Sequence, residues 1–147
     1  MEQEPVKDVV DIGIVVRDAD RSLAFYRDTL GLVEVGDVVL DTGRMWLLEW
    51  GRTMVKLLQH DQPVDAANPP GGLDGGTGYR WCTLWTRDIE AIVDRCTGAG
   101  YELAVPVTGR GERRFAMVVD PDGNWVELFD PGPATAPAPT PSGSGVR

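Results

Sequence analysis

The chain has 147 residues, enough for one compact domain of ordinary size with a substantial buried core. Hydrophobic residues make up 42% of it and charged residues 25%, near the averages for globular proteins. The net charge of −9, without clustered Lys or Arg, argues against nucleic acid as a partner. The acidic start and the lack of a long apolar run predict a cytoplasmic protein with no signal peptide and no membrane span.

The first part of the chain, 8–60, predicts one strand–helix–strand–strand–strand (βαβββ) unit. Residues 9–16 are rich in β-branched side chains and too short for a typical helix, so they predict a strand. Residues 20–30 carry apolar side chains at helical spacing and end at Gly31, a residue favoured after a helix. Turn residues separate three further predicted strands, and His60 is placed in the loop after the last of them; these strands cover 32–40, 44–50 and 53–59.

The second part of the chain repeats this order after a linker. Residues 61–78 contain three prolines and several glycines, which disfavour regular structure. The module over 79–130 then predicts a strand over 79–86, a helix from 89 to about 98, and strands over 102–107, 113–119 and 124–130. Residues 131–147 are rich in Pro, Ala, Thr, Ser and Gly and predict a disordered tail.

The two modules also agree in detail. An Arg-Asp dipeptide begins six residues after Asp11 and again six residues after Trp81, and a glycine ends each predicted helix. Agreement of dipeptide, helix and terminating glycine indicates an internal duplication. The two cysteines, Cys82 in a strand and Cys96 on the core side of a helix, are predicted to be buried reduced thiols.

Two segments carry a family resemblance. The segment DIGIVVRDADRSLAFYRDTLGL and the ending DPDGNWVELFD, joined by the duplicated βαβββ order, resemble the vicinal oxygen chelate superfamily. That superfamily includes glyoxalases, methylmalonyl-CoA epimerases, extradiol dioxygenases and bleomycin- and fosfomycin-resistance proteins. The resemblance covers residues 9–130 and implies an α+β fold whose two modules form a glyoxalase-like half-barrel cavity, completed or stabilised in a homodimer. It says less about activity, because such folds host many chemistries.

The resemblance also implies where a metal site would lie. Family enzymes commonly place metal ligands on the first and last strands of each module. The matching positions in this sequence are Asp11, Lys56, Trp81 and Glu127. Lys56 follows Asp11 by 45 residues and Glu127 follows Trp81 by 46, in keeping with the duplication.

These four positions are chemically unlike a family metal site. Glu127 keeps the usual ligand type, and Asp11 is a carboxylate that suits a hard cation such as magnesium or manganese. The indole nitrogen of Trp81 is only a donor, and the ammonium of Lys56 repels a dication. We therefore expect no metal cofactor; the alternative is a weakly bound Mg or Mn ion held by Asp11 and Glu127.

The charged residues leave two interpretations open. Lys56 with Asp11 and Glu127 forms either a structural ion cluster or a catalytic group. In the catalytic interpretation Lys56 polarises a carbonyl while one of the carboxylates moves a proton. This second interpretation predicts a metal-independent lyase, isomerase or cyclase.

Strand alternation predicts the remaining lining of the cavity. Side chains two residues apart in a strand point to the same face. The predicted ligand-binding face is aromatic and apolar, which suits flat organic ligands. It consists of Trp81, Thr83, Trp85, Trp125, Met54, Leu58 and Phe129. The pattern does not decide whether Trp46 and Trp50 face the cavity or a second subunit.

Three functions follow from this site. The first is a small-molecule-binding protein that sequesters an aromatic or hydrophobic natural product without a conventional metal site, as the resistance members of the family do. The second is an enzyme, either the metal-independent type that uses Lys56 or a weak metal enzyme that uses Asp11 and Glu127. The third is a structural or regulatory dimer whose cavity is vestigial.

Overall fold

The computed structural model of the chain describes residues 5–69 and 72–133. Within these residues the strands form two four-stranded sheets, with the orders β1-β4-β3-β2 and β5-β8-β7-β6. In each sheet the first strand of the module pairs parallel with the last, and the other pairs are antiparallel. The predicted α+β fold with two βαβββ modules is confirmed.

The first module follows the predicted order closely. Its elements are β1 (Ile12–Val15), α1 (Ala19–Leu23), the π-helix η1 (Ala24–Leu30), β2 (Val33–Leu40), β3 (Gly43–Trp50) and β4 (Thr53–His60). The helix ends at Gly31, whose φ of 95° is a left-handed conformation that glycine adopts without strain. The prediction for His60 was wrong, because its pairing with Gly43 extends β4 by one residue.

The second module has the same order after the linker. The linker contains the short 3-10 helix η2 (Gly72–Asp74). The module consists of β5 (Trp81–Trp85), α2 (Ile89–Gly98), β6 (Leu103–Arg110), β7 (Arg113–Val119) and β8 (Trp125–Asp130). At the start of the predicted tail, the Gly132 amide donates to Asp130 Oδ1 at 2.9 Å. Residues 134–147 of that tail lie outside the described residues.

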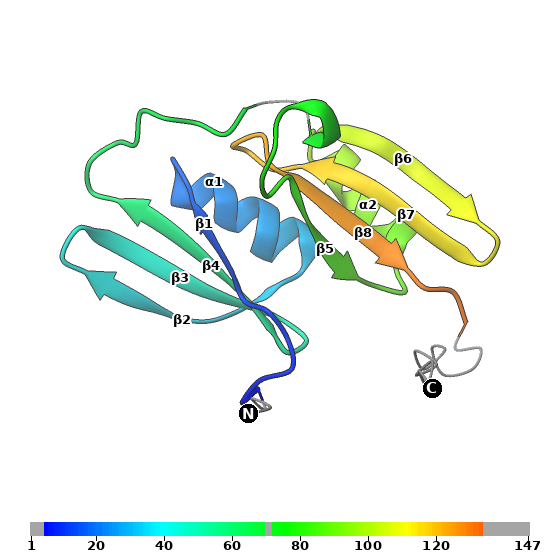
Figure 1. Cartoon of the computed structure of the whole chain (residues 1–147), viewed down its shortest axis with the longest axis horizontal. Helices are drawn as coiled ribbons and strands as arrows, with labels where there is room; N and C mark the ends of the chain where they lie inside the picture. Colours follow the sequence, from blue (N-terminus) through cyan, green and yellow to red (C-terminus); the bar gives the residue numbers. More distant parts are fainter. Residues whose placement is uncertain (1–4, 70–71, 134–147) are drawn as a thin grey trace, which may run out of the picture.

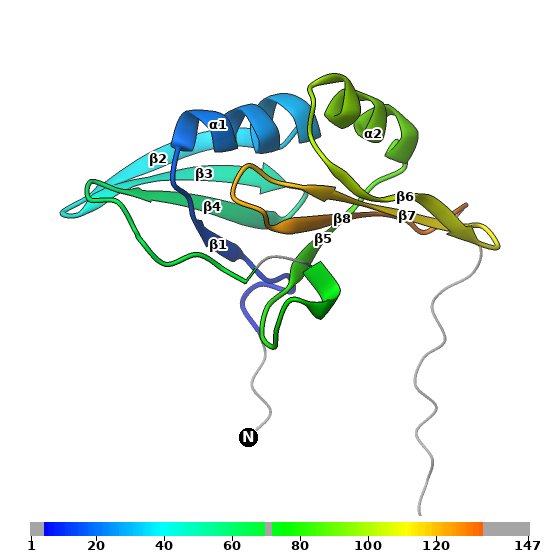
Figure 2. The same cartoon turned by 90° about the horizontal axis from the view of Figure 1, so that it is seen from above.

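The two sheets lie side by side, with β1 and β5 at their adjoining edges (Figure 1). Both helices cover one side of the sheets, whereas η2 lies on the other side (Figure 2). The core lies between helices and sheets, and Trp46 and Trp50 pack against it, so both indoles lie on the helix side of β3. Its fully buried large side chains include Tyr26, Phe25, Leu30, Leu48, Leu57, Leu84, Ile89 and Leu128.

Hydrogen bonds join the two modules at points away from the sheet pairing. The Arg95 guanidinium on α2 donates to the Thr29 carbonyl on η1 at 2.9 Å. The Trp50 indole donates to the Trp85 carbonyl at 2.9 Å, which links β3 to the end of β5.

In the part of the chain that the structure covers, no helix has the length and apolar character needed to cross a membrane.

Candidate ligand-binding site

The face of the sheets opposite the helices carries the predicted aromatic residues. Leu84, Val126 and Leu128 are buried toward the helices. Because side chains alternate along a strand, the neighbours of these residues point to the open face. That face of β5 and β8 holds Trp81, Thr83, Trp85, Trp125, Glu127 and Phe129, and the same face of β4 holds Met54, Lys56 and Leu58.

The open face of the second module is built from cross-strand pairs. Trp81 stands opposite Trp125, and Trp85 stands opposite Phe129 with ring centroids 4.8 Å apart in an edge-to-face arrangement. Trp81 remains 48% exposed and Trp85 62% exposed. Exposed indoles of this kind offer flat apolar surface for stacking.

Asp11 lies just before β1 and is held mainly by neighbours other than Lys56. Its carboxylate accepts a hydrogen bond from Lys7 Nζ at 2.5 Å and one from the Met54 amide at 2.9 Å. Lys56 Nζ lies 4.0 Å from Asp11 Oδ2. The hydrogen bond from Lys7 is the largest of the effects that lower the pKa of Asp11 below its ordinary value. Asp11 is therefore a weaker base than an ordinary aspartate.

The structure brings Asp11 and Lys56 together but does not join Glu127 to them. Glu127 instead accepts a hydrogen bond from the Thr83 hydroxyl at 2.5 Å, and among the described residues Lys56 makes no ion pair with it. Within residues 5–69 and 72–133, His, Cys, Asp and Glu form no group of three or more that could hold a metal ion. The donor set at the four family positions does not fit a divalent metal.

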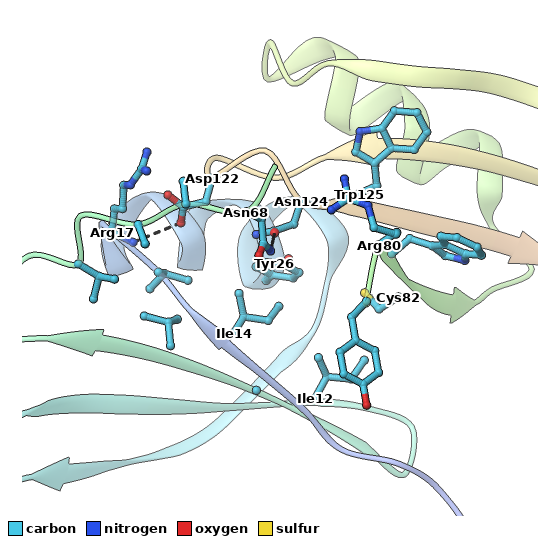
Figure 3. Close-up of a pocket in the computed structure, with 18 of the residues that line it drawn as sticks. Ile12, Ile14, Arg17, Tyr26, Asn68, Arg80, Cys82, Asp122, Asn124 and Trp125 are labelled. Atoms are coloured by element: carbon cyan, nitrogen blue, oxygen red, sulfur yellow. Dashed lines mark hydrogen bonds between the residues drawn. The ribbon is translucent and has the colours of Figure 1, made fainter. Parts of the chain in front are cut away.

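A cavity of about 850 Å³ follows the seam between the modules. Its walls are β1, the start of β5, the linker and the turn before β8 (Figure 3). Asp11, Trp81 and Trp125 line this cavity, so three of the predicted site residues share it. The other predicted residues lie on the open face outside its lining; they are Lys56, Glu127, Thr83, Trp85, Met54, Leu58 and Phe129.

The cavity also has polar lining residues that the sequence analysis missed. Tyr26, Asn68, Arg80 and Asn124 all line it. Tyr26 had the spacing of a core helix residue, and the other three lie outside the helices and strands. Burial raises the pKa of Tyr26 well above its ordinary value, and the neighbouring Asp120 carboxylate raises it further. Tyr26 therefore stays protonated and acts as a hydrogen-bond donor.

The two cysteine thiols are not activated as nucleophiles. Cys96 is buried, and Cys82 is half-buried at the edge of the cavity. Burial raises the pKa of Cys82 and of Cys96 to about 11. Because the thiolate is the reactive form, both thiols are poor nucleophiles near neutral pH.

Comparisons with known proteins agree with this architecture. The model of the glyoxalase/bleomycin resistance protein/dioxygenase superfamily matches residues 9–128. The chain belongs to this superfamily, which confirms the resemblance drawn from its sequence motifs. A search of curated proteins found no match.

Several solved structures are similar to the chain. A glyoxalase family protein from Bacillus cereus has a TM-score of 0.74 at 18% identity, over 88% of this chain and 96% of that one. A domain of the same superfamily from Frankia sp. EAN1pec has a TM-score of 0.72 at 19% identity, over 90% and 96%. Glyoxalase I from Leishmania major has a TM-score of 0.66 at 22% identity, over 82% and 84%. Similarity at these identities extends to the fold alone.

Proposed function

We propose that the protein binds a small, flat, aromatic or hydrophobic molecule, of the natural-product kind, and needs no divalent metal to do so. The observation that supports this most directly is Trp81. It occupies a position where family enzymes place a metal ligand, yet it presents a half-exposed indole to the seam cavity. Trp125 stands opposite it across the β5–β8 pair. A pocket of this volume, with apolar walls and a few polar groups, is typical of small-molecule sites.

The replacement Trp81→Ala tests this proposal with quinoline, a flat bicyclic probe. We expect the variant to bind quinoline about tenfold more weakly than the wild type, because it loses stacking and apolar contact area. Isothermal titration calorimetry measures the affinity. The control Val6→Ala removes apolar surface from a fully exposed side chain that lies outside the cavity lining, and should leave the affinity unchanged. Equal affinities for the wild type and Trp81→Ala would refute the assignment of Trp81.

The second candidate is a metal-independent lyase, isomerase or cyclase. The 4.0 Å separation of Lys56 Nζ and Asp11 Oδ2 favours it, since an ammonium beside a carboxylate suits proton transfer next to a carbonyl. The lowered pKa of Asp11 and the separate hydrogen bond of Glu127 weigh against it. We therefore rank it second to binding.

Proton exchange at a ketone separates the two candidates. NMR in heavy water measures exchange of the hydrogens next to the carbonyl of 1-indanone, in the presence of wild-type protein or Lys56→Met. The binding proposal predicts the same exchange rate with both proteins. Faster exchange with the wild type than with Lys56→Met would show that the protein is an enzyme, with Lys56 as the group that polarises the carbonyl.

A homodimer is part of the proposal. It is supported by the exposed apolar side chains on β2, among which Val33 is 61% and Val39 78% exposed. Exposed apolar surface on a strand at the edge of a sheet often marks a contact with another chain.

The cytoplasmic location remains a prediction from the sequence. If neither quinoline nor 1-indanone binds, the structural or regulatory dimer becomes the favoured function.

A further inference from the structure

A buried carboxylate organises the polar end of the seam cavity. Asp120 is 4% exposed and accepts hydrogen bonds from four donors. These are the Tyr26 hydroxyl at 2.8 Å, the Asp122 amide at 2.9 Å, the Asn124 amide at 2.8 Å and the Asn124 side-chain nitrogen at 2.9 Å. Carboxylate oxygens accept hydrogen bonds, so Asp120 fixes which end of the Asn124 amide faces it.

This carboxylate sets the orientation of two asparagine side chains in turn. Asn124 directs Nδ2 toward Asp120, which leaves its Oδ1 facing Asn68. Asn68 then directs its own Nδ2 toward that oxygen, at 3.0 Å. One N–H and the Oδ1 of the Asn68 amide remain, and the described residues engage neither of them. Asn68 lines the cavity beside Asn124 (Figure 3), and the planar amide carries both the remaining donor and the acceptor.

The lining holds four charged side chains, and three of them make hydrogen bonds within the protein; the fourth is Arg17, whose guanidinium makes no ion pair with the described residues. Asp11 is paired with Lys7, and Asp122 accepts from the Arg17 amide at 3.2 Å. The Arg80 guanidinium donates to the carbonyls of Gly72 and Pro69, at 2.7 and 3.0 Å. The four side chains are two acids, Asp11 and Asp122, and two bases, Arg17 and Arg80, so their formal charges cancel and a neutral polar ligand is favoured.

We propose that the seam cavity takes a neutral, flat heterocycle with a secondary lactam edge, whose N–H and C=O bind the amide of Asn68. This inference rests on the proposed binding function and adds the chemical class of ligand. The ring system stacks against Trp81 and Trp125, as quinoline would. The lactam carbonyl accepts from Asn68 Nδ2, and the lactam N–H donates to Asn68 Oδ1. An amide edge of fixed orientation discriminates well against ligands that lack either group.

Three probes of similar shape and size test the lactam edge. They are 2-quinolinone, N-methyl-2-quinolinone, which lacks the N–H, and quinoline, which lacks both lactam groups. Titration calorimetry on the full chain should show 2-quinolinone binding about tenfold more tightly than its N-methyl derivative. In Asn68→Ala this ratio should fall to about one, because the amide is gone. The control Asp65→Ala changes an exposed linker residue outside the lining and should keep the ratio.

The outcomes separate the two proposals. A ratio near one in the wild type, or a ratio that survives in Asn68→Ala, would overturn the lactam inference and leave the binding function intact. If the wild type bound none of the three probes, both the binding function and the lactam inference would be overturned. Because Asn68 is exposed in the linker, Asn68→Ala should keep the wild-type melting temperature, which circular dichroism checks.

Discussion

Replacing Asp120 by alanine is expected to lower the free energy of unfolding by about 3 kcal/mol, since buried donors that lose their acceptor are costly. The carboxylate serves four donors at once, and Tyr26, the source of one of them, is 1% exposed. The Tyr26 hydroxyl belongs to the first module and Asp120 to the second. The substitution therefore loosens the junction of the modules as well as the turn before β8.

Urea denaturation followed by circular dichroism measures this loss. The control is Asp61→Ala, which removes an exposed carboxylate from the linker and should change the free energy by less than about 0.5 kcal/mol. A loss below about 1 kcal/mol in Asp120→Ala would mean that water or other groups satisfy the four donors. The buried carboxylate would then not hold the junction together.

Phe25→Ala is expected to have the largest effect on stability, a loss of about 3–5 kcal/mol in the free energy of unfolding. The ring is 0% exposed and lies edge-to-face against Tyr26 and Tyr101, with centroids 4.9 and 4.8 Å away. Removing it leaves a cavity between the helices and the sheets that rigid neighbours fill only in part.

The same denaturation measurement tests this prediction. The control Val6→Ala loses apolar surface that is already fully exposed, and it should change the free energy by less than about 0.5 kcal/mol. If Phe25→Ala unfolded at nearly the same urea concentration as the wild type, the ring could not be part of the packed core. The position of Tyr26 beside the cavity would then also be in doubt.

Much of the fold could be predicted because the signals are local. The two-residue period of a strand assigned Thr83 and Trp85 to the same face as Trp81, and the burial of the intervening Leu84 toward the helices agrees with this. The position of Lys56 came from the family resemblance, and it lies outside the cavity lining.

The glycine at position 31 marked the helix end, and its left-handed φ explains why. Trp46 and Trp50 could not be assigned, because both faces of β3 are apolar and only packing against the core decides between them.

The polar part of the site could not be predicted because its partners are distant in sequence. Tyr26 lies 94 residues from Asp120, and Asn68 lies 56 residues from Asn124. No local pattern distinguishes such a tyrosine from an ordinary core residue, or such an asparagine from a linker residue. The hydrogen bond between Thr83 and Glu127 likewise depends on the register of β5 against β8, which the pattern within each strand leaves open.

Titration of manganese into the purified chain tests the central claim most directly. The matched positive control is the double variant Lys56→Glu/Trp81→His, which replaces the ammonium near Asp11 by an acid and the indole of Trp81 by an imidazole. Calorimetry should show no saturable binding to the wild type and one ion bound per chain in the double variant. One manganese ion bound tightly by each wild-type chain would contradict the account, because Lys56 and Trp81 would then not prevent metal binding.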